Sequence, residues 1–109
     1  MKEPFWVHIA TARQIHREQL EQFGGLAGVR DEGLFESAMS RPMNLWHYAS
    51  PSLFDMAASY AFGIANNHPF IDGNKRTAFV VSVLFLELNG INFGADEVSS
   101  AEIFIELAS

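Results

Sequence analysis

The sequence predicts a single all-α domain with a central buried helix, and three observations lead to this prediction. Its 109 residues suffice for one modest hydrophobic core but not for two. Apolar residues recur at helical spacing through most of the chain. No repeat, low-complexity tract or linker-like stretch divides the sequence. We therefore treat residues 1–109 as one domain.

The first helix is predicted over residues 11–23. Thr11 and Gln14 have the spacing of a capping box, in which two side chains satisfy free backbone groups at a helix start. Gly24 and Gly25 follow, and glycine commonly ends a helix.

A short second helix is predicted to begin after Asp31, whose carboxylate can cap it. Pro42 should end this helix, because proline lacks a backbone N–H and collides with the preceding turn. The stretch Met43 to Ala49 is then predicted to be a loop.

The third helix is predicted to start with Ser50 as N-cap and Pro51 at the first helical position. It should end near Asn66 and Asn67, because Pro69 disfavours α backbone at the residue before it. An apolar stripe at helical spacing identifies its buried face: Leu53, Met56, Ala57, Tyr60, Ala61 and Ile64.

The fourth helix is predicted from Lys75 to Leu88 and is apolar on nearly every side, which is typical of a central buried helix. Its run of β-branched and aromatic residues is also compatible with a strand, but the segment is longer than the usual strand of about 4 to 8 residues. Asn89 and Gly90 should end it. A brief extension at 91–93 and a last helix over 101–107, capped by Ser99 or Ser100, are expected to follow.

Composition excludes several classes of function. Without cysteine the chain can have no disulfide, no thiolate zinc site and no thiol nucleophile, which fits a reducing cytoplasm. The N-terminus lacks the apolar segment of a secretory signal, and no apolar stretch approaches the roughly 20 residues of a membrane span. A formal charge of −6 argues against general binding to nucleic acid. We therefore expect neither membrane nor direct nucleic-acid contact.

Bases are scarce in the second part of the chain, where only Lys75 and Arg76 follow Arg41. An adjacent pair of bases in an acidic region indicates an anion site, with a solvated helix end as the alternative. The same pair closes the nine-residue run from His68 to Arg76 at the predicted start of the fourth helix. The other polar residues of this run are His68, Asp72 and Asn74.

This run contains every group that phosphate chemistry needs. The turn Asp72-Gly73-Asn74 leads into a helix N-terminus, whose free N–H groups and positive dipole end attract anions. Gly73 permits close backbone approach, and Asp72 can hold Mg²⁺. Lys75 and Arg76 can bind phosphate, and His68 can accept a hydroxyl proton.

A purely structural interpretation exists for each of these residues. Asp, Gly and Asn are ordinary turn residues, Asn74 can serve as an N-cap, and a histidine before proline is commonly structural. The occurrence of all of them within nine positions at the mouth of a buried helix favours a functional site.

The run His68-Pro69-Phe70-Ile71-Asp72-Gly73-Asn74-Lys75-Arg76 resembles the motif of the Fic family, and more closely that of its death-on-curing (Doc) branch. The general Fic motif has glycine where Lys75 stands and a second arginine where Phe79 stands. Both departures are similar to the Doc branch. The turn from Phe23 to Leu26 and the pair Asn89-Gly90 extend the resemblance over most of the chain.

The resemblance implies a toxin kinase that uses ATP and Mg²⁺ to phosphorylate a Ser or Thr hydroxyl of elongation factor Tu. It implies catalytic roles for His68 as base, for Asp72 as metal ligand, and for Lys75 and Arg76, which with Gly73 and Asn74 hold the phosphates. Lys75 would fill part of the anion hole and reverse the nucleotide, so that the γ-phosphate is presented. Transfer of AMP to a protein hydroxyl is the alternative enzyme activity. A non-catalytic partner-binding module is the alternative outside enzymes.

The resemblance also bears on partners. Self-inhibited Fic proteins carry a Ser/Thr-x-x-x-Glu helix, which is absent here, so a Phd-like antitoxin is expected to restrain the toxin. The loop from Met43 to Tyr48 would lie where the family places a flap that docks the target, although its aromatics could equally belong to the core. Doc-like toxins usually continue to another helix, which we expect to be lacking here. A histidine-bound metal hydrolase is disfavoured, because His8, His16 and His47 form no i, i+4 pair.

Overall fold

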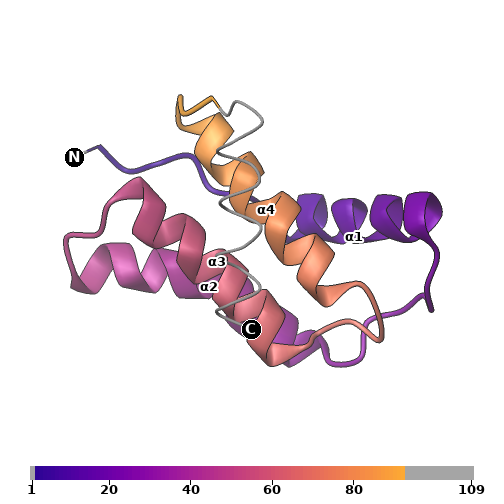
Figure 1. The fold of residues 1–109 in the computed structure, drawn as a ribbon. Coiled ribbons are helices and arrows are strands. Elements are labelled where there is room, and N and C mark those ends of the chain that lie inside the picture. Colours follow the sequence, from indigo (N-terminus) through magenta and orange to yellow (C-terminus); the bar gives the residue numbers. More distant parts are fainter. Residues whose placement is uncertain (1, 93–109) are drawn as a thin grey trace.

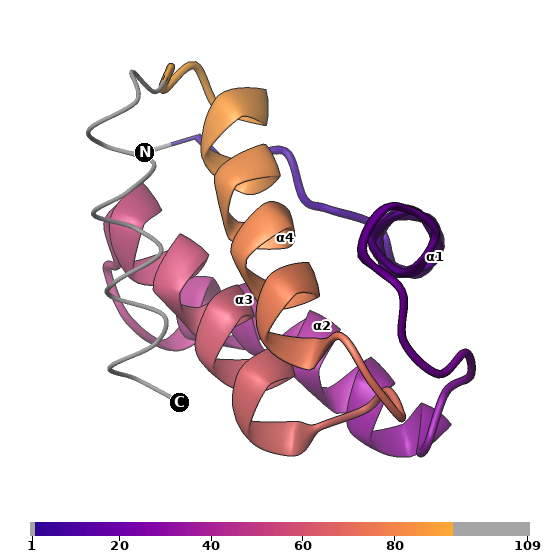
Figure 2. The ribbon, with the colours of Figure 1, turned by 45° about the vertical axis from the view of Figure 1, so that its right-hand side comes forward.

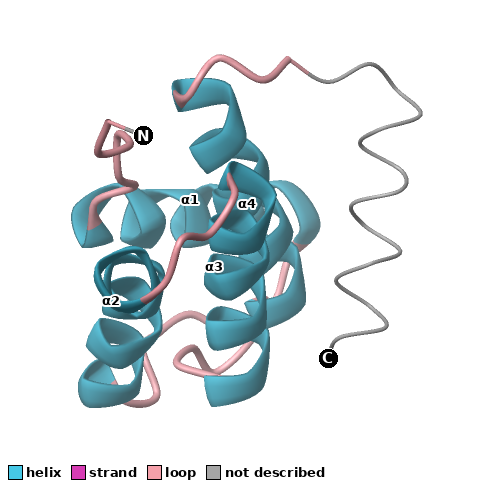
Figure 3. Ribbon diagram, turned by 90° about the vertical axis from the view of Figure 1, so that its left-hand side faces the viewer, coloured by secondary structure: helices cyan, strands magenta, loops and turns pink. Residues whose placement is uncertain are grey.

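The computed structural model describes residues 2–92, which form four α-helices (Figure 1). They are α1 (Ile9–Phe23), α2 (Glu32–Tyr48), α3 (Leu53–Asn67) and α4 (Asn74–Leu88). In this part of the chain there is no strand (Figure 3); an isolated antiparallel bridge joins Val29 to Phe70. The prediction of an all-α fold is confirmed. The helix predicted over 101–107 and its caps at Ser99 or Ser100 lie outside the described residues.

The helices pack in the spatial order α2, α3, α4, α1 (Figure 2). Helix α3 contacts α2 and α4, and α4 contacts both α3 and α1. Helix α4 is therefore central, as predicted. The buried apolar residues come from all four helices and from the segments that flank them: Val7, Ala12, Ile15, Phe35, Ala38, Met39, Met56, Ala57, Tyr60, Ala61, Ile64, Ala65, Phe70, Ala78, Val81, Phe85 and Leu86.

Helix α1 begins at Ile9, so the predicted capping box at Thr11 and Gln14 is wrong. His8 is the N-cap residue, and its side chain makes no capping hydrogen bond. The preceding residue, Val7, is instead fixed by the Tyr60 hydroxyl, which accepts from the Val7 N–H at 3.1 Å. Tertiary anchoring of the incoming chain, rather than a local cap, determines where this helix starts. Its predicted end at Phe23 is confirmed.

Helix α2 has the predicted cap, since the Asp31 carboxylate accepts from the Leu34 N–H at 3.0 Å. It does not end at Pro42 but runs through it to Tyr48, so the loop predicted from Met43 to Ala49 is wrong. A proline inside a helix costs about 3 kcal/mol. Pro42 is fully buried, and one buried face of α2 packs along α3, which outweighs that cost.

The start of α3 lies two residues later than predicted. Ser52, not Ser50, is the N-cap, because it forms a capping box with Asp55 that satisfies two backbone N–H groups. The predicted stripe on α3 is buried from Met56 to Ile64, with Leu53 half-buried. The helix ends at Asn67, as predicted.

The N-terminal segment lies across the end of α4. The Asn89 side chain accepts from the Phe5 N–H and donates to the Phe5 carbonyl, each at 2.9 Å. Trp6 stacks on Phe85 and meets Trp46 edge to face. Helix α4 itself begins at Asn74, one residue before the predicted start, and ends at Leu88 as predicted. Residues 91 and 92 have no regular structure, and Phe93 lies outside the described part.

None of these four helices combines the length and apolar character that crossing a bilayer requires.

Candidate functional site

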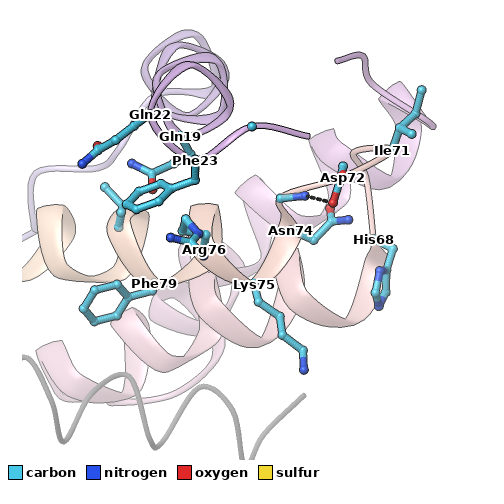
Figure 4. A pocket seen from close by; sticks show the side chains of 13 residues that line it. Gln19, Gln22, Phe23, His68, Ile71, Asp72, Asn74, Lys75, Arg76 and Phe79 are labelled. Atoms are coloured by element: carbon cyan, nitrogen blue, oxygen red, sulfur yellow. Dashed lines mark hydrogen bonds between the residues drawn. The ribbon is translucent and has the colours of Figure 1, made fainter. Parts of the chain in front are cut away.

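A cleft of about 870 Å³ lies where the end of α1 faces the beginning of α4 (Figure 4). All six predicted site residues line it: His68, Asp72, Gly73, Asn74, Lys75 and Arg76. The remaining lining residues come from α1, from the Gly24 turn and from the next turns of α4: Gln19, Gln22, Phe23, Gly24, Ile71, Phe79 and Val80. In Figure 4, His68 lies on the right side of the view and Phe79 on the left.

The N-terminus of α4 opens into this cleft. Gly73 is its N-cap, in the left-handed conformation with φ 78°, which favours glycine. No side chain caps the helix, and within residues 2–92 the backbone N–H groups of Asn74, Lys75 and Arg76 have no protein acceptor. Three free N–H donors and the positive helix end together favour an anion here.

The Asn74 side chain does not point to the cleft but closes the loop before α4. Its amide oxygen accepts from the Phe70 N–H and its amide nitrogen donates to the Phe70 carbonyl, both at 2.9 Å. The residue is buried, with 7% of its surface exposed. Asn74 can therefore offer its backbone N–H to an anion, while its side chain holds the loop in shape.

The Asp72 carboxylate is exposed and held by two backbone donors. Oδ1 accepts from the Gly73 N–H at 2.9 Å, and Oδ2 accepts from the Leu26 N–H at 3.2 Å. Each oxygen keeps a further lone pair for a cation. The described residues contain no cluster of three or more acidic or histidine side chains that could enclose a metal. A single carboxylate beside phosphate suits Mg²⁺, which keeps most of its waters, so the residues present fit this ion.

Lys75 and Arg76 are both exposed in the first turn of α4. The Arg76 guanidinium lies over the Phe23 ring, 3.8 Å from its centroid. Figure 4 shows Arg76 between Phe23 and Lys75. The cation–π contact restricts Arg76 to the α1 side of the cleft, and its N–H groups remain available at the ring's edge. Nothing in the spacing of the sequence indicated this pairing.

His68 is the C-cap of α3 and has left-handed backbone, with φ 48° and ψ 56°. The sequence predicted that Pro69 would force a departure from helix at this residue, and the structure has one. The imidazole is exposed and lines the cleft on the side opposite the Phe23–Arg76 pair. A histidine placed there can meet a hydroxyl group that approaches from solvent.

Comparison with known proteins identifies the family of the chain that carries this site. Residues 6–86 match the model of the Fic/DOC family. The chain belongs to the Fic/DOC family. Its Doc branch is indicated by two relatives with the word in their names. One, "Toxin Doc" of Mycolicibacterium smegmatis, is 43% identical over 83 residues, which make up 73% of this chain and 64% of that protein. The chain thus spans less than two thirds of that toxin's length.

The second relative is "Protein kinase doc" of Escherichia phage P1. It is 33% identical over 91 residues, which cover 82% of this chain and 72% of the phage protein. The Fic/DOC match runs from the N-terminal segment to α4, so it includes both walls of the cleft. The resemblance stated from the nine-residue motif is confirmed.

One further residue of this Fic/DOC domain supports the motif and was not predicted as such. His16 on α1 is 3% exposed and stacks on Phe70, with ring centroids 3.7 Å apart. Its Nε2 lies 2.8 Å from the carbonyl oxygen of Asp72, which can only accept a hydrogen bond. Burial lowers the pKa of His16 below its usual value, so the neutral ring with Nε2–H is favoured. The available signal was a polar residue beside Ile15 on the buried stripe of α1.

The flap expected from the Fic/DOC resemblance at Met43 to Tyr48 is wrong for this chain. These residues are the last turns of α2, at the end remote from the loop around Pro69. Trp46 is half-buried against Trp6, whereas Tyr48 is 90% exposed. Packing against the N-terminal segment, rather than a loop near the cleft, accounts for part of this aromatic cluster.

Proposed function

We propose that this chain is the toxin of a bacterial toxin–antitoxin pair and transfers the γ-phosphate of ATP to a Ser or Thr hydroxyl of elongation factor Tu, which arrests translation. The observation that carries the proposal is the convergence of His68, Asp72, Lys75 and Arg76 on one cleft at the N-terminus of α4. The names of the relatives, a toxin and a protein kinase, support it.

Each residue has a distinct task in this proposal. His68 accepts the proton of the target hydroxyl while the hydroxyl oxygen forms a bond to the γ-phosphorus. The bond between the γ-phosphorus and the oxygen that bridges it to the β-phosphate breaks, and ADP is released. The free N–H groups of α4, together with Lys75 and Arg76, hold the phosphates in line. Asp72 would hold Mg²⁺, which offsets the negative charge that moves onto the leaving group.

Lys75 favours phosphoryl transfer over AMP transfer. It replaces the glycine of the general Fic motif and places a long cationic side chain in the first turn of α4. The side chain takes space in the anion cradle and adds charge for a phosphoryl group in transfer. Phe79, at the position of a second arginine, removes a cation that AMP transfer would use.

The proposal includes a partner and a compartment. A Phd-like antitoxin restrains the toxin, because the chain has no Ser/Thr-x-x-x-Glu segment with which to inhibit itself. Both proteins act in the cytoplasm, where the target and ATP occur. Binding of a disordered antitoxin tail would be a coupled folding event.

Labelled ATP tests the reaction. The protein is incubated with Mg²⁺ and purified elongation factor Tu, or with bacterial lysate, and with ATP labelled at either the γ- or the α-phosphorus. We expect only the γ-label to enter protein, and we expect His68→Ala to abolish transfer without lowering the melting temperature, because the imidazole is exposed. Incorporation of the α-label would instead establish AMP transfer.

The non-catalytic alternative is tested by expression. If the domain were only a binding module, His68→Ala would slow growth as strongly as the unchanged protein. We expect the substitution to relieve toxicity as fully as co-expression of the antitoxin does. Growth arrest that persists in the His68→Ala strain would contradict the enzyme assignment.

A further inference from the structure

Arg30, in the segment before α2, contacts the carbonyl groups of three successive residues at the end of α3. Its Nε donates to the His68 carbonyl at 2.7 Å, and Nη2 donates to the Asn67 carbonyl at 2.8 Å. Its backbone N–H donates to the Pro69 carbonyl at 2.6 Å. Arg30 thus donates hydrogen bonds to the carbonyl group of the proposed base, His68, and to the carbonyl groups of the residues before and after it.

The backbone that Arg30 holds is unusual. Within residues 2–92, His68 is the one non-glycine residue with positive φ. Left-handed backbone is sparsely populated by residues with a Cβ, and it persists where surrounding contacts impose it. Because the Cα–Cβ direction follows from φ and ψ, the contacts that impose this backbone also determine where the imidazole projects.

The segment that carries Arg30 and the end of α3 are both hydrogen-bonded to the start of α2. Asp31 caps α2 through its carboxylate and donates its backbone N–H to the Pro69 carbonyl at 3.1 Å. Asn67 donates from its side chain to the Leu34 carbonyl at 3.1 Å. The guanidinium charge also lies at the carbonyl end of α3, where a cation is favoured. The backbone from which Arg30 reaches His68 is therefore held in place by hydrogen bonds at the start of α2.

We propose that Arg30 is a positioning residue: by holding the carbonyls of Asn67 and His68 it keeps His68 in left-handed backbone, so that the imidazole faces the cleft at the mouth of α4. The inference rests on the proposed function in one respect, that His68 is the base. It assigns to Arg30 no contact with nucleotide or target, since Arg30 does not line the cleft. A simple helix-capping role would affect stability alone.

Three variants test this inference. Arg30→Ala removes both side-chain bonds, and Arg30→Lys retains the charge and one donor. Arg13→Ala is the matched control, because Arg13 also anchors the start of α2, through paired bonds of 2.7 and 3.0 Å to Glu32, but lies outside the cleft. Steady-state kinetics with γ-labelled ATP give kcat and the KM for ATP separately.

We expect Arg30→Ala to lower kcat by about 10- to 100-fold with an unchanged KM for ATP, as a displaced catalytic group does. Arg30→Lys should recover part of the loss, and Arg13→Ala should keep the kcat of the wild type. If Arg30→Ala does not fold, Arg30→Lys decides: a kcat equal to that of Arg13→Ala would overturn the inference. An equal loss in Arg30→Ala and Arg13→Ala would likewise reduce Arg30 to a structural role.

A second readout does not depend on catalysis. The amide and imidazole NMR signals of His68, assigned by their disappearance in His68→Gln, should shift in Arg30→Ala and stay in place in Arg13→Ala. Signals that do not move in Arg30→Ala would overturn the inference. A wild-type protein with no transferase activity, yet with His68 signals that depend on Arg30, would overturn the proposed function and leave the conformational role of Arg30 supported.

Discussion

The buried imidazole of His16 and the carbonyl oxygen of Asp72 lie 2.8 Å apart and join α1 to the loop that precedes α4. The same ring stacks on Phe70, so α1 supports two residues of the motif at once. A Cβ added at Gly73 would also lie within ordinary contact distance of this ring, 3.6 Å from its Cδ2. The shape of the loop that carries the site thus depends on a residue 56 positions earlier in the chain.

The hydrogen bond and the stacking of His16 can be separated by substitution. We expect His16→Phe to keep the stack on Phe70 and to lower the free energy of unfolding by about 1 kcal/mol, the usual contribution of one hydrogen bond. His16→Ala should lose more, because it also removes a buried ring. Urea denaturation measures both values. Equal losses in the two variants would show that the stack contributes nothing.

Gly25 limits the position of the Asp72 carboxylate. A Cβ on Gly25, where φ is +123°, would lie 2.9 Å from Asp72 Oδ2. We therefore expect Gly25→Ala to displace the carboxylate and to raise the Mg²⁺ concentration that gives half-maximal transfer. The measurement is the initial rate as a function of Mg²⁺ concentration.

Gly24→Ala is the matched control for this effect. Gly24 also has positive φ, +81°, but a Cβ there meets no atom within 4 Å. It should share the backbone strain of Gly25→Ala without its shift in Mg²⁺ dependence. Identical magnesium curves for the two variants would remove Asp72 from the proposed metal site.

Lys75 discriminates between the two candidate transfer reactions. If its ammonium contacts the nucleotide's phosphates, Lys75→Gly should lower γ-phosphate transfer by about 100-fold or more, as loss of a charge directed at a transition state does. Weak AMP transfer could then appear, although Phe79 makes an efficient gain unexpected. The γ- and α-labels report each product.

Introducing glycine into a helix lowers its stability by about 1 kcal/mol whatever the role of the residue it replaces, so a control variant is needed. Glu87→Gly also introduces a glycine into α4, at an exposed position in the last turn of the helix, away from the cleft. Its transfer rate should equal that of the wild type. A Lys75→Gly variant that also keeps the full rate with γ-labelled ATP would refute the kinase mechanism.

Tyr60 predicts a loss of stability in alkali. Burial raises the pKa of Tyr60 from 10.0 to about 12, while its hydroxyl is shared with the backbone of Val7. Below pH 10 the group is neutral in both states and its contribution is complete. Between pH 10 and 12 the unfolded chain releases the proton and the folded chain keeps it, so stability falls by up to about 1.4 kcal/mol per pH unit.

The comparison variant is Tyr60→Phe, which cannot ionise and should lack this part of the pH dependence. Urea denaturation of both proteins between pH 9 and 11 gives the difference in slope. Parallel curves would show that Tyr60 has the same pKa in the folded and unfolded chains.

Periodicity predicted the parts of the fold that are determined by burial. The stripe on α3 and the length of α4 followed from apolar spacing, because those helices pack on two neighbours. The errors arose where tertiary packing overrides a local signal. Pro42 would end an isolated helix, yet here it is fully buried and the helix that contains it packs on α3. The capping spacing at Thr11 has no effect, because the helix start follows from the anchoring of Val7 by Tyr60.

The residues of the site likewise fall into those that the sequence predicted and those that it did not. Its six site residues could be found because they fall within nine consecutive positions and carry a specific combination of charges and turn residues. His16, Phe23 and Arg30 could not, because each acts through contacts with residues distant in sequence. A lone histidine, phenylalanine or arginine has no spacing that marks such a contact.

The bonds between Phe5 and Asn89 span 84 positions, so the first residues of the fold are secured by nearly the last residue described. During synthesis the N-terminal segment and α1 leave the ribosome before their partners on α4 exist. Both walls of the cleft therefore cannot meet on a nascent chain until the codons for α4 have been translated. The cleft that carries the motif is thus assembled only after nearly all of the described chain has been synthesised.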